Sequence, residues 1–182
     1  MVIVFEGQHD QYSMDGTLVK ILDKAKKIVK KDWDMVFVVD GKEGAGKSVF
    51  AQQVAYYLDP TLNLTRVVFS PFEFQDAVYK AKKFQAIVYD EAYGGLSSKG
   101  TMSKVNKMLV KMFTEIRSRN LFIFIVLPSI FLLDKTPAIW RSRVLFRVYD
   151  RKFQRGFFEF YNSDRKKELY LSILSTRNSK IF

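Results

Sequence analysis

The sequence contains no cysteine and only one histidine, His9. A disulfide framework and a thiolate metal site are therefore excluded, and a single histidine cannot form a histidine cluster. Long apolar runs are also missing: the longest, residues 121–133, is too short to cross a bilayer and contains Pro128 and Ser129. The first residues lack the basic and then apolar pattern of a signal peptide. These absences predict a cytoplasmic protein without a membrane partner.

Apolar residues are plentiful, at 48% of the 182 residues, and 15% are aromatic. A chain of this length and composition can bury a core of its own, so we do not expect it to be disordered. No repeat, low-complexity tract or Gly/Ser linker divides it. The sequence predicts one domain, with a core over residues 35–161, a strand-and-helix extension over residues 1–34 and a basic tail over residues 162–182.

Positive charge is in excess and unevenly distributed. The 30 Lys and Arg against 19 Asp and Glu give a net charge of +11. Residues 135–182 contribute +8 of this and residues 1–134 only +3. An excess of cations favours a polyanionic partner, because Lys and Arg that bind phosphates release condensed counterions. DNA is the expected partner, although a basic surface that only keeps the protein soluble has the same composition.

The apolar pattern predicts helices that alternate with strands. Asp15 is placed to cap the first helix, and Ser70, Pro71 and Glu73 form a capping box for the third. Helices are expected from Asp15 to about Val29 and over residues 47–58, 70–82 and 102–118. Strands are expected over residues 1–6, 35–40, 66–70, 86–92, 121–127, 144–150 and 156–161. This alternation indicates an α/β fold with a mostly parallel sheet between two layers of helices.

The stretch GKEGAGKS, residues 41–48, matches the pattern G-x-x-x-x-G-K-[ST]. Glycines allow backbone N–H groups to curl around phosphate oxygens, and the helix that begins at Gly46 directs the positive end of its dipole at them. In such a loop Lys47 reaches the β- and γ-phosphates of ATP, and Ser48 binds Mg²⁺. The expected nucleotide contacts are Gly41, Lys42, Glu43, Gly44, Ala45, Gly46, Lys47, Ser48 and Val49.

Two acids follow the apolar stretch AIVY: Asp90 and Glu91. The carboxyl ends of parallel strands form the ligand-binding edge of a sheet, so Asp90 is placed to hold Mg²⁺. Glu91, directly beside it, is placed to polarise the water that attacks the γ-phosphate, which makes it the expected catalytic base. An acidic pair that is merely exposed is the alternative interpretation.

These two motifs resemble the Walker A and Walker B motifs of the additional-strand, catalytic-glutamate (ASCE) division of P-loop NTPases. Within that division, residues 35–161 are similar to DNA-pumping ATPases of the HerA and FtsK type, including viral genome-packaging ATPases, and to the related Zot-like phage assembly proteins. The resemblance implies a three-layer, RecA-like fold with strand order 5-1-4-3-2, to which a C-terminal hairpin strand is added. It further implies hydrolysis of ATP with Mg²⁺ between subunits of a homo-oligomeric ring that encloses DNA.

The resemblance also suggests residues that act on the γ-phosphate. These pumps often carry an amide side chain at the end of the fourth strand as a phosphate sensor, and Ser129 stands at that place here. An arginine from a neighbouring subunit stabilises the transition state in such rings. Arg117 and Arg119 are the preferred candidates, and Arg141 and Arg143 are further ones. Lys42 resembles the lysine of the deviant Walker A motif in partition ATPases, which crosses to the partner's nucleotide, but those proteins usually lack an acid like Glu91.

A polar and basic loop, residues 94–104, follows the two acids. Lys99, Lys104 and Lys107 are placed to contact a nucleic-acid backbone and to couple it to Glu91. The alternative is a connection with no binding role. The basic turn RKFQR, residues 151–155, contains Phe153, and the strand-like alternation of the aromatic residues there favours a place in the core over a stacking role.

Together these features predict a Mg²⁺-dependent ATPase that moves or packages DNA for a virus or mobile element. A nucleoside or nucleotide kinase shares the glycine loop but needs an arginine-rich lid over the phosphates, for which no segment stands out. A nucleotide-gated assembly protein of the Zot kind is the third possibility. It would bind ATP tightly without turning it over.

Overall fold

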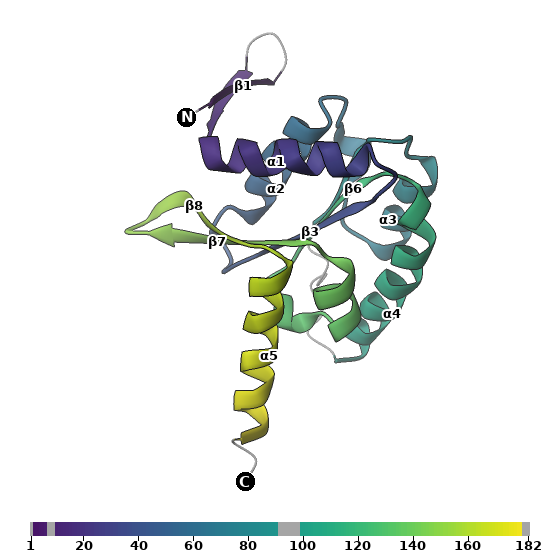
Figure 1. Cartoon of the computed structure of the whole chain (residues 1–182), viewed down its shortest axis with the longest axis vertical. Helices are drawn as coiled ribbons and strands as arrows, with labels where there is room; N and C mark the ends of the chain where they lie inside the picture. The colour runs from purple at the N-terminus through teal and green to yellow at the C-terminus, as the bar shows by residue number, and fades with distance from the viewer. Residues whose placement is uncertain (1, 7–9, 91–98, 180–182) are drawn as a thin grey trace.

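The computed structural model describes residues 2–6, 10–90 and 99–179 (Figure 1). Its centre is a six-stranded sheet with the order β4-β5-β6-β3-β7-β8. Its first five strands pair in parallel, and β8 runs antiparallel to β7. The predicted α/β class with a mostly parallel sheet is therefore confirmed. The strands are β3 (Met35–Asp40), β4 (Val67–Val68), β5 (Ala86–Tyr89), β6 (Phe122–Val126), β7 (Val144–Arg151) and β8 (Gln154–Tyr161).

The strand order differs from 5-1-4-3-2 when all strands of the chain are numbered. The reason is that β1 (Val2–Glu6) and β2 (Asp10–Met14) pair with each other in a separate two-stranded sheet. Counted from β3 alone, the parallel strands run 5-1-4-3-2, with β8 added beyond β7. The apolar pattern predicts only β1 of the first pair, because the residues of β2 are mostly polar.

Helices cover both faces of the sheet (Figure 1). On one face, Phe37 and Val39 of β3 share a core with α1 and α2. On the other, Val36 and Val38 share a core with α3 and α4. β3 is thus buried on both sides, which explains its unbroken apolar run. The helices are α1 (Gly16–Val29), α2 (Lys47–Leu58), α3 (Pro71–Lys80), α4 (Lys99–Glu115) and α5 (Ser163–Ser179), with short turns η1 (Leu64–Arg66), η2 (Ile116–Ser118), η3 (Ile130–Leu132) and the π-helical η4 (Thr136–Arg141).

The helix starts follow the predicted caps. Asp15 Oδ1 accepts hydrogen bonds from the backbone N–H groups of Thr17 (2.8 Å) and Leu18 (3.0 Å) at the start of α1. At the start of α3, Ser70 Oγ accepts from Glu73 N, and the Glu73 carboxylate accepts from Ser70 N. Both caps satisfy amides that have no acceptor inside the helix, and both predictions are confirmed.

The segment expected as a basic tail contains α5, which is docked through a buried lysine. Lys166 Nζ donates hydrogen bonds to the carbonyl oxygens of Ala138 (2.7 Å) and Ser142 and to Ser142 Oγ (2.5 Å). Burial lowers the pKa of Lys166 to about 7. Within residues 2–6, 10–90 and 99–179, none of the helices has the length and apolar character of a transmembrane span.

Candidate functional site

The glycine loop, residues 41–46, leaves the carboxyl end of β3 between the neighbouring strands β6 and β7. Gly41 has φ +147°, and a Cβ atom added there would overlap the carbonyl oxygen of Val148 in β7. Only glycine therefore lets the loop leave β3 this close to β7. Gly46 has φ +96° and turns the chain into α2. The predicted glycine turn between a buried strand and a helix is therefore present.

The N-terminus of α2 faces this loop without a side-chain cap, because Gly46 occupies the cap position. Its first helical hydrogen bond runs from Phe50 N to Gly46 O (3.0 Å). Amides of the first turn of an α-helix have no acceptor within the helix, and the dipole makes this end positive. The predicted helix over residues 47–58 is confirmed, and its start has the properties of an anion site.

The side chains of the loop divide into exposed charged ones and buried small ones. Lys42 and Glu43 are exposed, whereas Ala45 is buried in the core shared with α1 and α2. Lys47 Nζ donates a hydrogen bond to the carbonyl oxygen of Lys42 (2.8 Å), so its ammonium lies against the loop. Ser48 is half-buried in the first turn of α2. Lys47 and Ser48 thus both lie next to the backbone that would cradle a phosphate.

Asp90 directly follows β5 and is 4% exposed. Its backbone N–H donates to the carbonyl oxygen of Val68 in the edge strand β4 (2.9 Å). In the sheet register, both Tyr89 and Val38 lie beside Ile125, so Asp90 leaves the sheet at the level of the last residues of β3, with β6 between them. The predicted metal ligand therefore lies at the same edge of the sheet as the glycine loop.

Oxygen donors at this edge suit Mg²⁺. A buried carboxylate and a hydroxyl, from Asp90 and Ser48, are hard ligands of the kind that this ion takes alongside water and substrate phosphates. No group of three or more His, Cys, Asp or Glu side chains that could enclose a metal by itself is found in the part of the chain that the structure describes. Glu91, the predicted catalytic base, lies outside the described residues.

An ion pair at the start of the loop joins two residues that no sequence motif singles out. Asp40, with its side chain 2% exposed, accepts two hydrogen bonds from Arg147 of β7: Nε to Oδ1 and Nη2 to Oδ2, each 3.1 Å. Asp40 Oδ2 also accepts from Ile130 N (3.1 Å). Hydrogen bonds from Arg147 to Asp40 raise the pKa of the arginine. The pair ties the end of β3 to β7 and to the segment after β6.

Ser129 lies in this same segment, beside the loop. Its Oγ accepts a hydrogen bond from Phe131 N (3.4 Å) at the start of η3. With Gly41, Lys42 and Arg147, Ser129 lines a pocket of about 300 Å³. The structure thus brings the predicted phosphate sensor and the predicted lysine to one side of the loop.

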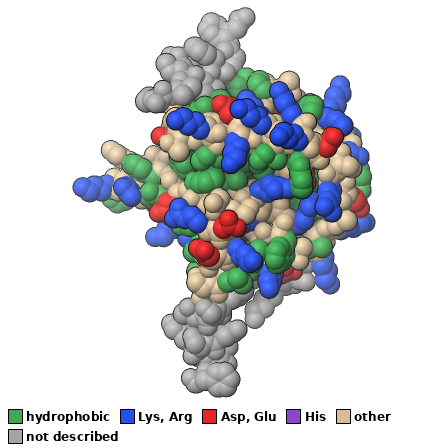
Figure 2. All heavy atoms as spheres, in the orientation of Figure 1, with side chains coloured by type: hydrophobic (Ala, Val, Ile, Leu, Met, Phe, Trp, Pro, Cys, Tyr) green, Lys and Arg blue, Asp and Glu red, His purple; other side chains and the backbone are tan. Residues whose placement is uncertain are grey.

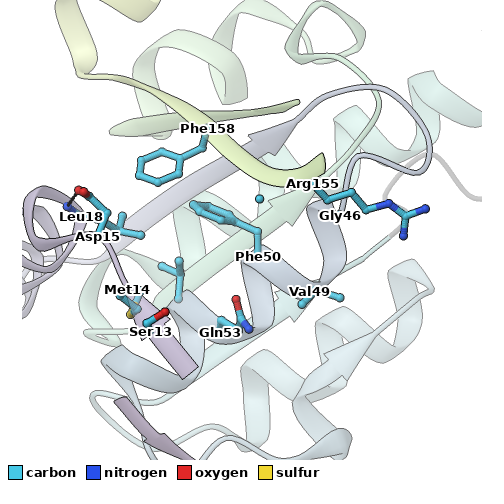
Figure 3. A pocket seen from close by; sticks show the side chains of 12 residues that line it. Ser13, Met14, Asp15, Leu18, Gly46, Val49, Phe50, Gln53, Arg155 and Phe158 are labelled. Atoms are coloured by element: carbon cyan, nitrogen blue, oxygen red, sulfur yellow. Dashed lines mark hydrogen bonds between the residues drawn. The ribbon is translucent and has the colours of Figure 1, made fainter. Parts of the chain in front are cut away.

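A second pocket, of about 380 Å³, opens on the other side of the loop (Figure 3). It lies between the start of α1, the first turns of α2 and β8. Buried apolar side chains and exposed polar ones both line it, and Val49, a predicted nucleotide contact, is exposed at its edge. Its lining residues are Ser13, Met14, Asp15, Leu18, Gly46, Val49, Phe50, Gln53, Val54, Arg155, Gly156 and Phe158. An apolar wall with a few polar groups next to the glycine loop is suited to a nucleotide base and ribose.

Arg117 and Arg119, the preferred arginine fingers, lie away from the loop. Arg117 lies within η2 and Arg119 directly follows it, before the start of β6. Because β6 runs parallel to β3, the two arginines and the loop lie at opposite edges of the sheet. Arg119 Nη1 donates to the carbonyl oxygens of Val78 (2.9 Å) and Tyr79 (3.0 Å) at the end of α3. Arg117 is exposed. Neither can act on the nucleotide of its own chain, and Arg119 has a structural role.

Arg141 and Arg143 also make structural contacts at the sheet edge opposite the loop. Arg141 Nη2 pairs with Asp34 Oδ2 at 3.1 Å, just before β3. Arg143 lies over the ring of Trp33, 4.6 Å from its centroid. The sequence does not distinguish a structural arginine from a catalytic one, because both can stand at the same position before a strand.

The three lysines expected to contact nucleic acid, Lys99, Lys104 and Lys107, all belong to α4. Lys107 is exposed. The side chains of Lys99 and Lys104 are not among those that the structure describes.

No protein-family model matches the chain, and no curated protein sequence is similar to it. Among solved structures, the chain is similar to the N-terminal domain of zonular occludens toxin from Neisseria meningitidis. The two chains are 13% identical, with a TM-score of 0.45, and the similarity covers 77% of this chain and 91% of the other.

Proposed function

We propose that this protein binds ATP with Mg²⁺ at the glycine loop, hydrolyses it and uses the cycle to move DNA. The observation that carries the proposal is the edge of the sheet where the loop, the uncapped start of α2 and buried Asp90 meet. Backbone amides there favour a phosphate, and a carboxylate beside them favours the metal that a phosphate chain brings.

Each residue has a defined task in this proposal. Amides of residues 42–48 bind the phosphate oxygens, and Lys47 neutralises charge on the β- and γ-phosphates. Ser48 and Asp90 would hold Mg²⁺, which when bound supplies charge neutralisation for the departing phosphate. Glu91, by its position after Asp90, orients the attacking water and accepts its proton. The 380 Å³ pocket beside Val49 receives the base and ribose.

Self-association belongs to the proposal because the two preferred arginine fingers cannot reach the nucleotide of their own chain. Arg117 and Arg119 lie at the sheet edge opposite the loop. A neighbouring copy or Lys42 then supplies the cation that stabilises the developing charge on the γ-phosphate. Such a cation raises the rate by about 10³- to 10⁵-fold. A homo-oligomeric ring around DNA satisfies this need and uses the net charge of +11.

The test is phosphate release from ATP measured with and without duplex DNA, beside a mass measurement of the assembled protein. We expect Mg²⁺-dependent turnover that DNA stimulates and a mass of several chains. Lys47→Ala should abolish binding and turnover. Phosphoryl transfer to nucleosides would instead establish a kinase, and tight ATP binding without turnover, with DNA present, would establish a nucleotide-gated assembly protein.

A further inference from the structure

The hairpin of β7 and β8 ends in a tip, residues 151–155, that projects from the body of the protein (Figure 1). The last strand pair joins Arg151 and Gln154, and the turn between them consists of Lys152 and Phe153. Their φ angles are +48° and +62°. Two-residue turns with both φ angles positive favour Asn and Gly, because a Cβ atom is strained in that region. This turn therefore keeps two large side chains where backbone geometry disfavours them.

Phe153 is 100% exposed, the highest value among the large apolar side chains of the described residues. Strand alternation predicts it in the core, and that prediction is wrong, because the residue lies in the turn beyond the last strand pair. Its ring contributes nothing to the packing of this chain. A strained backbone position and an unburied ring together indicate that the side chain serves a contact outside the chain.

Basic residues lie on both sides of Phe153 in the sequence. Arg151, Lys152 and Arg155 are all exposed, residues 151–155 contain no acid, and Figure 2 shows basic side chains gathered at the tip. None of the three forms a salt bridge with any residue that the structure describes. The guanidinium of Arg151 lies over the rings of Tyr149 and Phe157, 5.3 and 5.6 Å from their centroids. The tip thus offers an exposed aromatic ring on a strongly basic turn.

We propose that the hairpin tip binds single-stranded nucleic acid, with Phe153 stacked on a base and Arg151 and Lys152 on the flanking phosphates. An aromatic ring beside cations matches the alternation of bases and phosphates in a single strand. A ring at the end of a hairpin can stack only on a base whose face is open, which favours a single strand over an intact duplex. A single ring is a small anchor for a membrane, and the cations of the tip match a polyanion better than a second copy of a chain with net charge +11.

The hairpin also touches the glycine loop at two points. The carbonyl oxygen of Val148 occupies the space beside Gly41, and a Cβ atom added to Gly46 would lie 3.9 Å from Arg155 Cβ. A shift of the loop on nucleotide binding would therefore move β7 and β8, and with them the tip. This coupling rests on the proposed ATPase function; binding of a single strand by the tip does not.

The test of binding uses the full chain and fluorescence anisotropy with labelled oligothymidylate. Phe153→Ala should weaken binding by about five- to a hundredfold, as expected for the loss of one stacked base. Phe153→Trp should retain it. Phe72→Ala is the matched control, because that ring is 84% exposed on α3, and its affinity should equal that of the wild type. Equal affinities for Phe153→Ala and Phe72→Ala would overturn the proposal.

Charge and folding are checked separately. Lys152→Gln should lower the slope of log affinity against log salt by about 0.7, and Phe153→Ala should leave this slope unchanged. Phe153→Gly should unfold at the same or a higher urea concentration than wild type while losing affinity, so that a lower affinity cannot be due to misfolding. Binding to phosphatidylserine vesicles that Phe153→Ala abolishes, with unchanged oligothymidylate affinity, would assign the tip to a membrane and refute the proposal.

The ATPase measurement separates this inference from the proposed function. Phe153→Ala should keep the basal turnover of ATP and lose its stimulation by single-stranded DNA. If the wild type has no turnover but Phe153→Ala still weakens oligothymidylate binding, the ATPase proposal fails and the binding surface stands. If turnover is present and stimulated equally in both proteins, the hairpin inference fails and the ATPase stands.

Discussion

Replacement of Gly41 by alanine tests the close approach between the glycine loop and β7. The new Cβ atom would overlap the carbonyl oxygen of Val148 and lie 3.1 Å from its carbonyl carbon, and φ would be +147°. The unfavourable backbone region costs about 1–2 kcal/mol. Forced separation of two paired strands in a packed core adds about 1–3 kcal/mol. We therefore expect Gly41→Ala to lower the free energy of unfolding by about 2–5 kcal/mol.

Urea unfolding followed by circular dichroism measures this change. Gly44→Ala is the matched control in the same loop: its φ is +75°, and an added Cβ atom has nothing within 4 Å. It should show only the backbone term of about 1–2 kcal/mol. If Gly41→Ala were no less stable than Gly44→Ala, the clash with Val148 would not exist in solution. The link between the loop and the hairpin would then lose its basis.

Three other predictions concern catalysis, the buried pair and the buried lysine. Glu91→Gln should retain ATP affinity, measured by nucleotide fluorescence, and lose turnover; unchanged turnover would remove its role as base. Asp40→Asn should lower the free energy of unfolding by about 2 kcal/mol, because it leaves the half-buried Arg147 without its charge partner, whereas exposed Asp150→Asn should cost less than about 0.5 kcal/mol. Burial lowers the pKa of Lys166 to about 7 from 10.5, so the unfolded chain binds more protons between these values and stability should rise with pH there. Urea titrations at several pH values should show this rise in wild type and in exposed Lys111→Met but not in Lys166→Met.

Local patterns identified the elements whose signals lie within a few residues. The helix over residues 47–58, its glycine at the start and the caps by Asp15 and Ser70 all follow from spacing and side-chain chemistry alone. The parallel sheet also follows, because strands that are buried on both faces leave unbroken apolar runs. In each of these elements, residues close together in the sequence determine the local structure.

Contacts between residues far apart in the sequence could not be predicted from local patterns. The pair of Asp40 and Arg147 joins positions 107 apart, and nothing in either local pattern marks them as partners. Strand alternation placed Phe153 in the core, but the position of the turn left it fully exposed. A mostly polar second strand and a helix in the basic C-terminal segment were likewise not predicted.

A glycine loop between a buried strand and a helix, and an Asp90 after a second buried strand, can be read from residue order alone, because both depend on short-range geometry. The fold was needed to show that these two features meet at one edge of the sheet and that Arg117 and Arg119 lie at the other. Strand order and direction depend on packing across the whole sheet, which no local pattern records. Sequence spacing identifies candidate site residues, and tertiary packing determines which of them can contact the same ligand.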